Sequence, residues 1–202
     1  MQLGEAHAKI KLLKQPFFQT RDIMALLNLT STTASKTLSR LTKQGHLAQL
    51  QRGLWALPEK VEPMMLPEQL TAPFPSYVSL QSALHYHGMI EQIPEIVYAV
   101  SLARTKTFNL CWIAVSIHHI PTAFYFGYIS VKNNVKIATP EKALLDFLYL
   151  RPAKNRLFTT LPELEISKTF DYKLCCEWIN KIPARSRRTM VEKQFELIYA
   201  KN

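Results

Sequence analysis

Three short helices are predicted from the spacing of apolar residues over the first 45 positions. Each has apolar positions three or four apart, which places one face toward a core. The helices span residues 5–14, 21–27 and 31–44. Thr20 and Thr30 are the expected N-caps of the second and third helices, and Pro16, Asn28 and Gly45 are the expected ends. The pattern predicts a compact helical unit.

The third of these helices has an apolar stripe and an opposite polar face. Ala34, Leu38 and Leu41 form the stripe, at spacings of four and three. At about 100° per residue, the side chains that point away from it or lie at its edge carry hydroxyl or cationic groups. They are Thr32, Thr33, Lys36, Ser39, Arg40 and Lys43. Such groups bind DNA phosphates and base edges, so this face is the predicted DNA contact.

After Gly45 the alternation changes to that of strands. Residues 46–50 and 54–57 read as two short strands joined by a turn that contains Arg52 and Gly53. Three helices followed by a hairpin is the plan of a winged helix-turn-helix domain, in which the third helix enters the major groove. Arg52 at the wing tip would reach an adjacent groove or the backbone. The alternative is a protein-interaction module whose basic face is merely solvated.

The net charge of +10 is unevenly distributed along the 202 residues. Residues 1–60, 61–138 and 139–202 carry net charges of +6, 0 and +4. A basic N-terminal segment before a neutral middle is typical of a separate unit that binds a polyanion. Five prolines lie near its end and after it: Pro58, Pro63, Pro67, Pro73 and Pro75. The predicted organisation is a winged-helix domain at 1–60, a semi-extended linker at 61–76 and a second domain at 77–202.

The second domain is predicted to be α+β. A helix is expected to start near Ser79, and Thr139 with Pro140 opens another that ends before Pro152. Two further helices are expected at 172–181 and 186–201. The strands expected between the first two helices span residues 96–103, 112–118, 124–131 and 135–138.

Several function classes are disfavoured by composition. Apolar runs such as Leu110–Ile117 are shorter than the roughly 18 residues of a membrane span, and no signal-peptide pattern is present, so a protein without a membrane anchor is expected. Cys111, Cys175 and Cys176 suit neither a disulfide framework nor a zinc site, which favours a reducing, cytoplasmic setting. No phosphate loop, nucleophile elbow or metalloprotease motif is found. The expectation is a protein that is not an enzyme and needs no cofactor.

The sequence also contains histidines and acidic residues of the types found in metal and nuclease sites. His85 and His87 would lie about 200° apart on a helix, so a shared metal is not expected, and His118 and His119 would face opposite sides of a strand. A nuclease-like enzyme is kept as a minor alternative. Its acidic and cationic groups would come from Glu141, Asp146, Glu163, Glu165 and Lys168.

A basic cluster opens the predicted last helix. Arg185, Arg187 and Arg188 lie where the helix dipole is positive, an unfavourable place for cations. A bound phosphate or an acidic partner would relieve this conflict, which predicts a secondary anion or partner contact. The alternative is a solvated helix end.

Two segments resemble AbiEi-type antitoxins. They are the run from Tyr77 to Pro94 (YVSLQSALHYHGMIEQIP) and the run from Ala138 to Asp146 (ATPEKALLD). The preceding winged helix is also similar to that of this family.

The resemblance implies a function for each domain. Members are antitoxins of type IV toxin–antitoxin systems, associated with abortive infection and phage defence. The winged helix would bind double-stranded DNA at inverted repeats upstream of its own operon, as a transcriptional repressor. The C-terminal domain would counteract an AbiEii-like nucleotidyltransferase toxin without a stable complex. The alternative is a winged-helix regulator or interaction protein that has no toxin partner.

Overall fold

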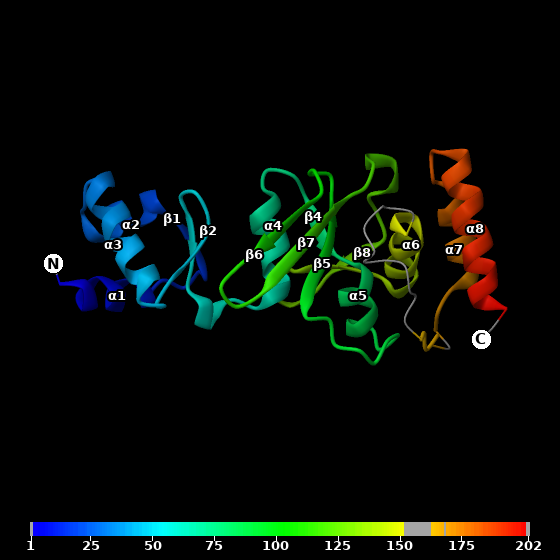
Figure 1. Ribbon diagram of the computed structural model, residues 1–202, viewed down its shortest axis with the longest axis horizontal. Helices are drawn as coiled ribbons and strands as arrows, with labels where there is room; N and C mark the ends of the chain where they lie inside the picture. Colours follow the sequence, from blue (N-terminus) through cyan, green and yellow to red (C-terminus); the bar gives the residue numbers. More distant parts are fainter. Residues whose placement is uncertain (1, 152–162, 168, 201–202) are drawn as a thin grey trace. The chain divides into compact units, whose positions relative to one another are not determined.

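The computed structural model describes residues 2–151, 163–167 and 169–200 of the chain. The chain divides into two compact units (Figure 1): the first contains Met1–Leu66 and Leu110–Trp112, and the second contains Pro67–Asn109 and Ile113–Asn202. We call them the N-terminal unit and the C-terminal unit and describe each by itself. Helices and sheets occur together, as the expected α+β class requires. No helix in the described part of the chain combines the length and the apolar character that crossing a membrane requires.

The N-terminal unit contains three helices and a three-stranded antiparallel sheet. Its elements are α1 (Leu3–Lys11), β1 (Phe17–Gln19), α2 (Thr20–Leu27), α3 (Ser31–Lys43), β2 (Ala48–Gln51) and β3 (Leu54–Ala56). The strand order is β1-β3-β2. The three helices and the hairpin were predicted, whereas β1 was not. Its three residues are too few for a periodic signal, and its partner β3 is remote in sequence.

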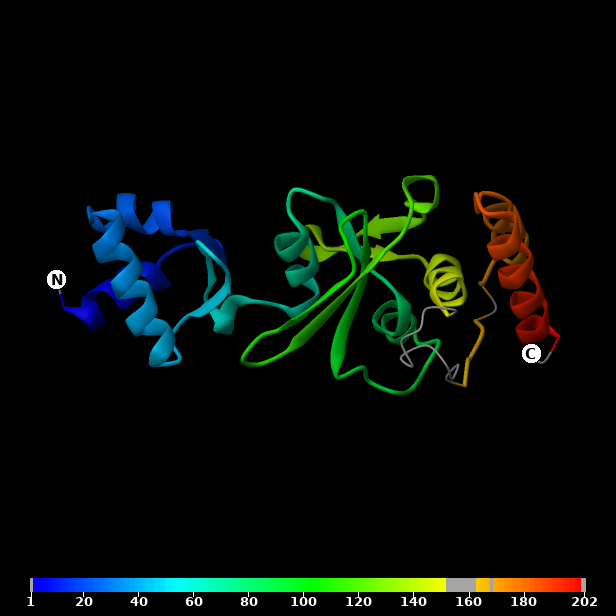
Figure 2. The same cartoon turned by 45° about the horizontal axis from the view of Figure 1, so that its top comes forward.

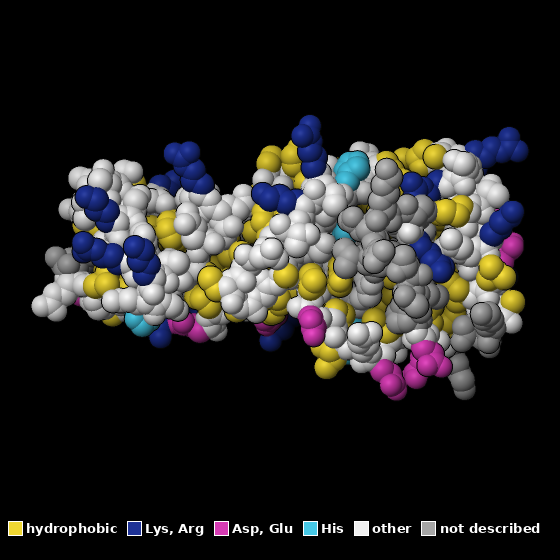
Figure 3. All heavy atoms as spheres, viewed as in Figure 1, with side chains coloured by type: hydrophobic (Ala, Val, Ile, Leu, Met, Phe, Trp, Pro, Cys, Tyr) yellow, Lys and Arg dark blue, Asp and Glu magenta, His cyan; other side chains and the backbone are white. Residues whose placement is uncertain are grey.

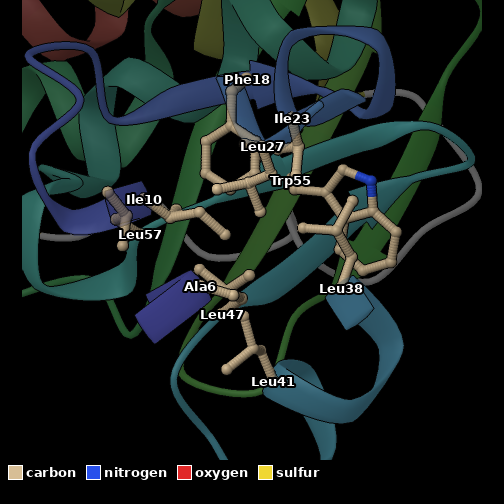
Figure 4. Packing of buried hydrophobic residues seen from close by; sticks show 10 residues of the cluster. All are labelled: Ala6, Ile10, Phe18, Ile23, Leu27, Leu38, Leu41, Leu47, Trp55 and Leu57. Carbon is tan, nitrogen blue, oxygen red and sulfur yellow. The ribbon is translucent and has the colours of Figure 1, made fainter. Parts of the chain in front are cut away.

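Ten buried residues form the core of this unit. Their side chains come from all three helices and from the sheet and point toward one another (Figure 4). They are Ala6, Ile10, Phe18, Ile23, Leu27, Leu38, Leu41, Leu47, Trp55 and Leu57. Because α3 buries only Ala34, Leu38 and Leu41, most of its surface remains available for other contacts.

The N-cap predicted for α2 was wrong by one residue. The helix begins at Thr20, and Gln19 is its N-cap in a reciprocal capping box with Asp22. The backbone amide of Gln19 donates to Asp22 Oδ2 at 2.6 Å. Thr20 is itself the first residue of the helix, and its hydroxyl accepts a hydrogen bond from Trp55 Nε1 at 3.0 Å. The two residues are 35 positions apart, so no local sequence pattern predicts this contact.

The proline-rich segment 61–76 is not the semi-extended linker that was predicted. It contains a short helix, α4 (Leu66–Thr71), and the beginning of β4 (Ser76–Val78). Leu66, Leu70 and Thr71 are buried. Pro67 sits in the first turn of α4, where a helix needs no amide donor from it, so proline density does not exclude this helix.

The C-terminal unit is built on a six-stranded mixed sheet. Its strands are β4, β5 (Ile96–Ser101), β6 (Lys106–Asn109), β7 (Ala114–His119), β8 (Tyr128–Ser130) and β9 (Lys136–Ala138). The order is β6-β7-β5-β4-β9-β8. Pairs β5–β7 and β4–β9 are parallel, and the other three pairs are antiparallel.

Helices cover this sheet in successive layers. They are α5 (Leu80–Tyr86), α6 (Pro140–Leu150), α7 (Tyr172–Asn180) and α8 (Arg185–Tyr199). The α5 helix packs against β5 and α6, and α6 packs against α7 and α8 (Figure 2). The α6 helix therefore lies in the interior, and its residues from Glu141 to Leu148 are all buried.

The strand predictions for this unit were partly wrong. Strands β4 and β6 were not predicted, and only Tyr128–Ser130 of the expected strand 124–131 is extended in the sheet. Phe124, the first residue of that expected strand, instead ends a 3-10 turn, Thr122–Phe124. Aromatic and β-branched composition suits a buried loop as well as a strand, and only pairing distinguishes the two.

His118 makes the stability of the protein dependent on pH. Burial on β7 lowers the pKa of His118 to about 4, and its Nε2 lies 3.0 Å from Ser116 Oγ. The unfolded chain takes up a proton below pH about 6.5, but the folded protein does not until about pH 4. The free energy of unfolding should therefore fall as the pH drops through this window.

The measurement is chemical denaturation at several pH values. His118→Gln should have a flatter pH profile than the wild-type protein, because the residue that resists protonation is gone. His119→Gln is the matched control, since His119 is the exposed neighbour on the same strand. Equal pH profiles for wild type and His118→Gln would contradict this assignment.

Candidate nucleic-acid interface

The exposed face of α3 carries the side chains predicted for it. Thr32, Thr33, Lys36, Ser39, Arg40 and Lys43 are all exposed. Thr30 caps the helix as predicted and accepts from the amide of Thr33 at 3.4 Å. The Thr33 hydroxyl lies 3.0 Å from that of Thr30, so Thr33 also belongs to the cap. Lys36, Ser39, Arg40 and Lys43 extend along the helix surface beyond it.

The electrostatic character of this face is uniformly positive. The α3 sequence contains no acidic residue, and within the described part of the chain none of its cations forms an ion pair. Lysine and arginine side chains gather on one face of the N-terminal unit, over α3 and beside the β2–β3 hairpin (Figure 3). A surface of this kind attracts a polyanion and lacks internal carboxylates to compete with it.

The hairpin turn places Arg52 at the wing tip. Arg52 and Gly53 connect β2 to β3, and Arg52 is exposed. Gly53 has a positive φ of +79°, a backbone conformation that glycine adopts without steric cost. A β-bulge between Gln49 and Gln51 precedes this turn.

The wing is fastened to the beginning of α2. The amide of Thr20 donates to the carbonyl of Gly53 at 3.0 Å, in addition to the Trp55–Thr20 bond. These bonds fix the hairpin relative to the helix that precedes α3. Sequence reasoning missed this junction, because the residues that form it lie more than 30 positions apart.

Two of the three arginines at the start of α8, for which an anion contact was predicted, bind backbone carbonyls of the protein itself. Arg187 Nη1 donates to the carbonyl of Tyr149 at 2.8 Å, and Arg188 donates twice to the carbonyl of Ile182, at 3.0 and 2.7 Å. These carbonyls lie at or just beyond the C-terminal ends of α6 and α7, where helices attract cations. The two arginines thus relieve the dipole conflict within the protein, and Arg185 alone of the three is exposed.

A buried polar cluster occupies the centre of the C-terminal unit. Lys142 and Asp146, one turn apart on α6, form an ion pair with both side chains fully buried. Tyr77 and Ser79 donate to the other carboxylate oxygen of Asp146, at 3.0 and 2.7 Å. Burial raises the pKa of Asp146 and lowers that of Lys142, and the pairing opposes both shifts. Because no member of the pair reaches solvent, its arrangement is that of a core network.

The residues of the nuclease alternative do not form one site in the described structure. Glu141 and Asp146 are buried, and Glu141 Oε1 accepts from the amide of Asp171 at 3.1 Å. Glu163 and Glu165 instead line an open pocket of about 660 Å³ together with Ile90, Glu91 and Gln92. Lys168 lies outside the described residues.

The histidines and cysteines lie in different environments, some buried and some exposed. His87 Nε2 lies 2.7 Å from the carbonyl of Ala138, and His118 is buried while His119 is exposed, as expected for neighbours on a strand. Over the described ranges, no group of three or more potential ligands gathers around a metal position. Cys175 is buried and Cys111 is exposed.

Comparison with known protein families identifies the segment that carries this face. A family model described as "Transcriptional regulator, AbiEi antitoxin" matches residues 10–58, which run from α1 through α2, α3 and the hairpin. No curated protein matches the chain significantly. The matched segment contains α3 and Arg52, and thus the whole basic face described above.

Proposed function

We propose that this protein is a DNA-binding repressor of its own operon, because residues 10–58 match the family model of AbiEi antitoxin transcriptional regulators. The observation that carries the proposal is the acid-free, cationic and hydroxyl-bearing face of α3 inside the segment that the family model matches. In this proposal α3 lies in the major groove of double-stranded DNA and Arg52 contacts an adjacent groove or the backbone.

The chemistry of this face separates into two contributions. Lys36, Arg40 and Lys43 neutralise phosphates or bind guanine edges, whereas Thr32 and Ser39 donate to phosphates or meet thymine methyl groups. Phosphate contacts provide affinity for any duplex, and base-edge contacts provide selectivity. A site in an inverted repeat would place two copies of the protein on related half-sites.

The C-terminal unit carries the antitoxin part of the proposal. Its expected counterpart is an AbiEii-like nucleotidyltransferase toxin of a type IV system, acting in the cytoplasm and in phage defence, and counteracted without a stable complex. Support comes from the match of residues 10–58 to the family model and from the resemblance of residues 77–94 and 138–146. Relief of growth arrest when this chain is co-expressed with a nucleotidyltransferase from the same operon is the corresponding test.

The DNA-binding proposal is tested by fluorescence anisotropy over a salt series from about 50 to 200 mM. The full chain is titrated onto a duplex from upstream of its own operon and onto a scrambled duplex of equal length. We expect tighter binding to the upstream duplex and a loss of affinity of orders of magnitude across the series, because bound phosphates release counterions.

Two results would overturn the proposal. Equal weak affinity for both duplexes would show that the basic face is nonspecific. Absence of binding would favour the alternative in which the winged helix is a protein-interaction module.

A further inference from the structure

We propose that Arg21 and Arg52 together form a second phosphate-contact site, separate from the face of α3, at the junction of α2 and the wing. This inference rests on the proposed DNA-binding function and assigns a role to Arg21, which lies outside the recognition helix. The ligand of this junction would be the phosphate backbone of DNA.

The geometry of the junction brings two remote segments together. The β1 strand pairs with β3, with Gln19 opposite Leu54, and leads directly into α2. The hydrogen bonding between these two segments continues by one bond, from the Thr20 amide to the Gly53 carbonyl at 3.0 Å. Arg21 and Arg52 are the next residues beyond this bonded pair, one on each segment. Their backbones are therefore held close together by a hydrogen bond between their immediate neighbours.

The Trp55 indole makes this junction rigid. Its Nε1 donates to Thr20 Oγ1 at 3.0 Å, and its ring belongs to the buried core of the unit. Thr20 is thus bonded through both its amide and its hydroxyl to the hairpin that carries Arg52. A cation held on such a base loses less freedom on binding than one on a mobile loop.

Arg21 has no strong partner in the described part of the chain. Its side chain is 78% exposed, and its Nε lies 3.9 Å from Asp22 Oδ1, beyond hydrogen-bond distance. Asp22 Oδ2 instead accepts from the Gln19 amide at 2.6 Å, so the capping box orients this carboxylate toward the helix end. The guanidinium donors of Arg21 remain available to an external anion.

The chemistry of two neighbouring guanidinium groups suits the DNA backbone. Each can form two parallel hydrogen bonds with a phosphate, a geometry that lysine cannot reproduce. The α2 helix, which begins at this junction, packs against α3 in the N-terminal unit. A strand that borders the groove occupied by α3 would therefore meet Arg21 and Arg52, which would set the position of α3 without reading sequence.

The experiment measures the salt dependence of DNA binding by the full chain. We compare Arg21→Ala, Arg52→Ala and the double variant on the upstream and scrambled duplexes. Log affinity falls as log salt rises, and each single variant should make this slope shallower by about 1. The double variant should make it shallower by about 2. The affinity ratio between the two duplexes should be unchanged, because phosphate contacts act on every sequence alike.

Two further variants keep the result interpretable. Lys9→Ala removes a cation that is paired with Glu5 on α1, and it should leave the slope at the wild-type value. Arg21→Lys keeps the charge and should retain the slope while binding more weakly, because it loses the two-bond geometry. Equal circular dichroism spectra establish that every variant is folded.

The outcomes distinguish this inference from the function on which it rests. If Arg21→Ala leaves the slope unchanged while substitutions on α3 weaken binding, the protein binds DNA and the junction site is wrong. If Arg21→Ala changes the ratio between the duplexes, Arg21 reads bases and the assignment to phosphate is overturned. If the wild-type protein binds neither duplex, both the proposed function and this inference fail.

Discussion

Asp146→Ala is expected to lower the free energy of unfolding by about 3–5 kcal/mol, the usual cost of removing one partner of a buried ion pair. The variant leaves the Lys142 ammonium without its counter-charge in a site where both side chains are fully buried. It also removes the acceptor of the Tyr77 and Ser79 hydroxyl groups. Urea denaturation followed by circular dichroism measures the loss.

Two control variants show whether the loss of stability comes from the buried ion pair. Glu165→Ala removes an exposed carboxylate of the same unit and should change the free energy of unfolding by no more than about 0.5 kcal/mol. The double variant Lys142→Met/Asp146→Leu removes both charges and should recover part of the loss. If Asp146→Ala stays within about 1 kcal/mol of the wild-type protein, the network is not a determinant of stability.

Asp146→Asn provides a pH signature for the same network. Without the carboxylate, burial lowers the pKa of Lys142 with no opposing charge. The unfolded chain then binds a proton that the folded protein resists, up to the ordinary lysine pKa of about 10.4. The variant should therefore gain stability as the pH rises from about 7 toward 10, and by more than the wild-type protein does.

Lys36→Ala/Arg40→Ala is expected to abolish most of the selective DNA binding. Removing one side chain that binds a base edge costs about 1–3 kcal/mol, so the double variant should bind its upstream duplex at least tenfold more weakly at fixed salt. Both side chains are exposed on α3 and are absent from its buried stripe, so the fold should persist. Anisotropy titrations on the upstream and scrambled duplexes measure the affinity and the selectivity.

The matched control for this pair is again Lys9→Ala, which changes charge on α1 without touching α3. It should reduce affinity by much less than the α3 variant at the same salt. Unchanged affinity of Lys36→Ala/Arg40→Ala would show that this face of α3 does not contact DNA, even if the protein binds DNA elsewhere.

Local signals predicted the N-terminal unit well. The apolar spacing of α3, its Thr30 cap and the two-residue turn before β3 are short-range features, and each is found at or near its expected place. The exposed face of α3 follows from helix geometry alone once its apolar stripe is known. In the C-terminal unit, Thr139 and Pro140 marked the beginning of α6 for the same reason.

Pairing between remote residues could not be predicted in this way. Strands β1 and β6 are three and four residues long and are strands only because β3 and β7 lie beside them. The helix α4 was not predicted because the segment is rich in proline, although Pro67 is compatible with the first turn of a helix. Arg187 and Arg188 carried a clear charge pattern, but their partners are carbonyls near the ends of other helices.

The sequence by itself determined the α+β class, the helices and hairpin of the winged unit and the side chains exposed on α3, because periodicity and capping act within one element. Only the tertiary structure decided that Thr20 joins α2 to the wing, that Arg187 of α8 binds the end of α6, and that Lys142 and Asp146 are sealed in a core. Each of these depends on contacts across 35 or more residues, or on burial, which a local pattern does not encode.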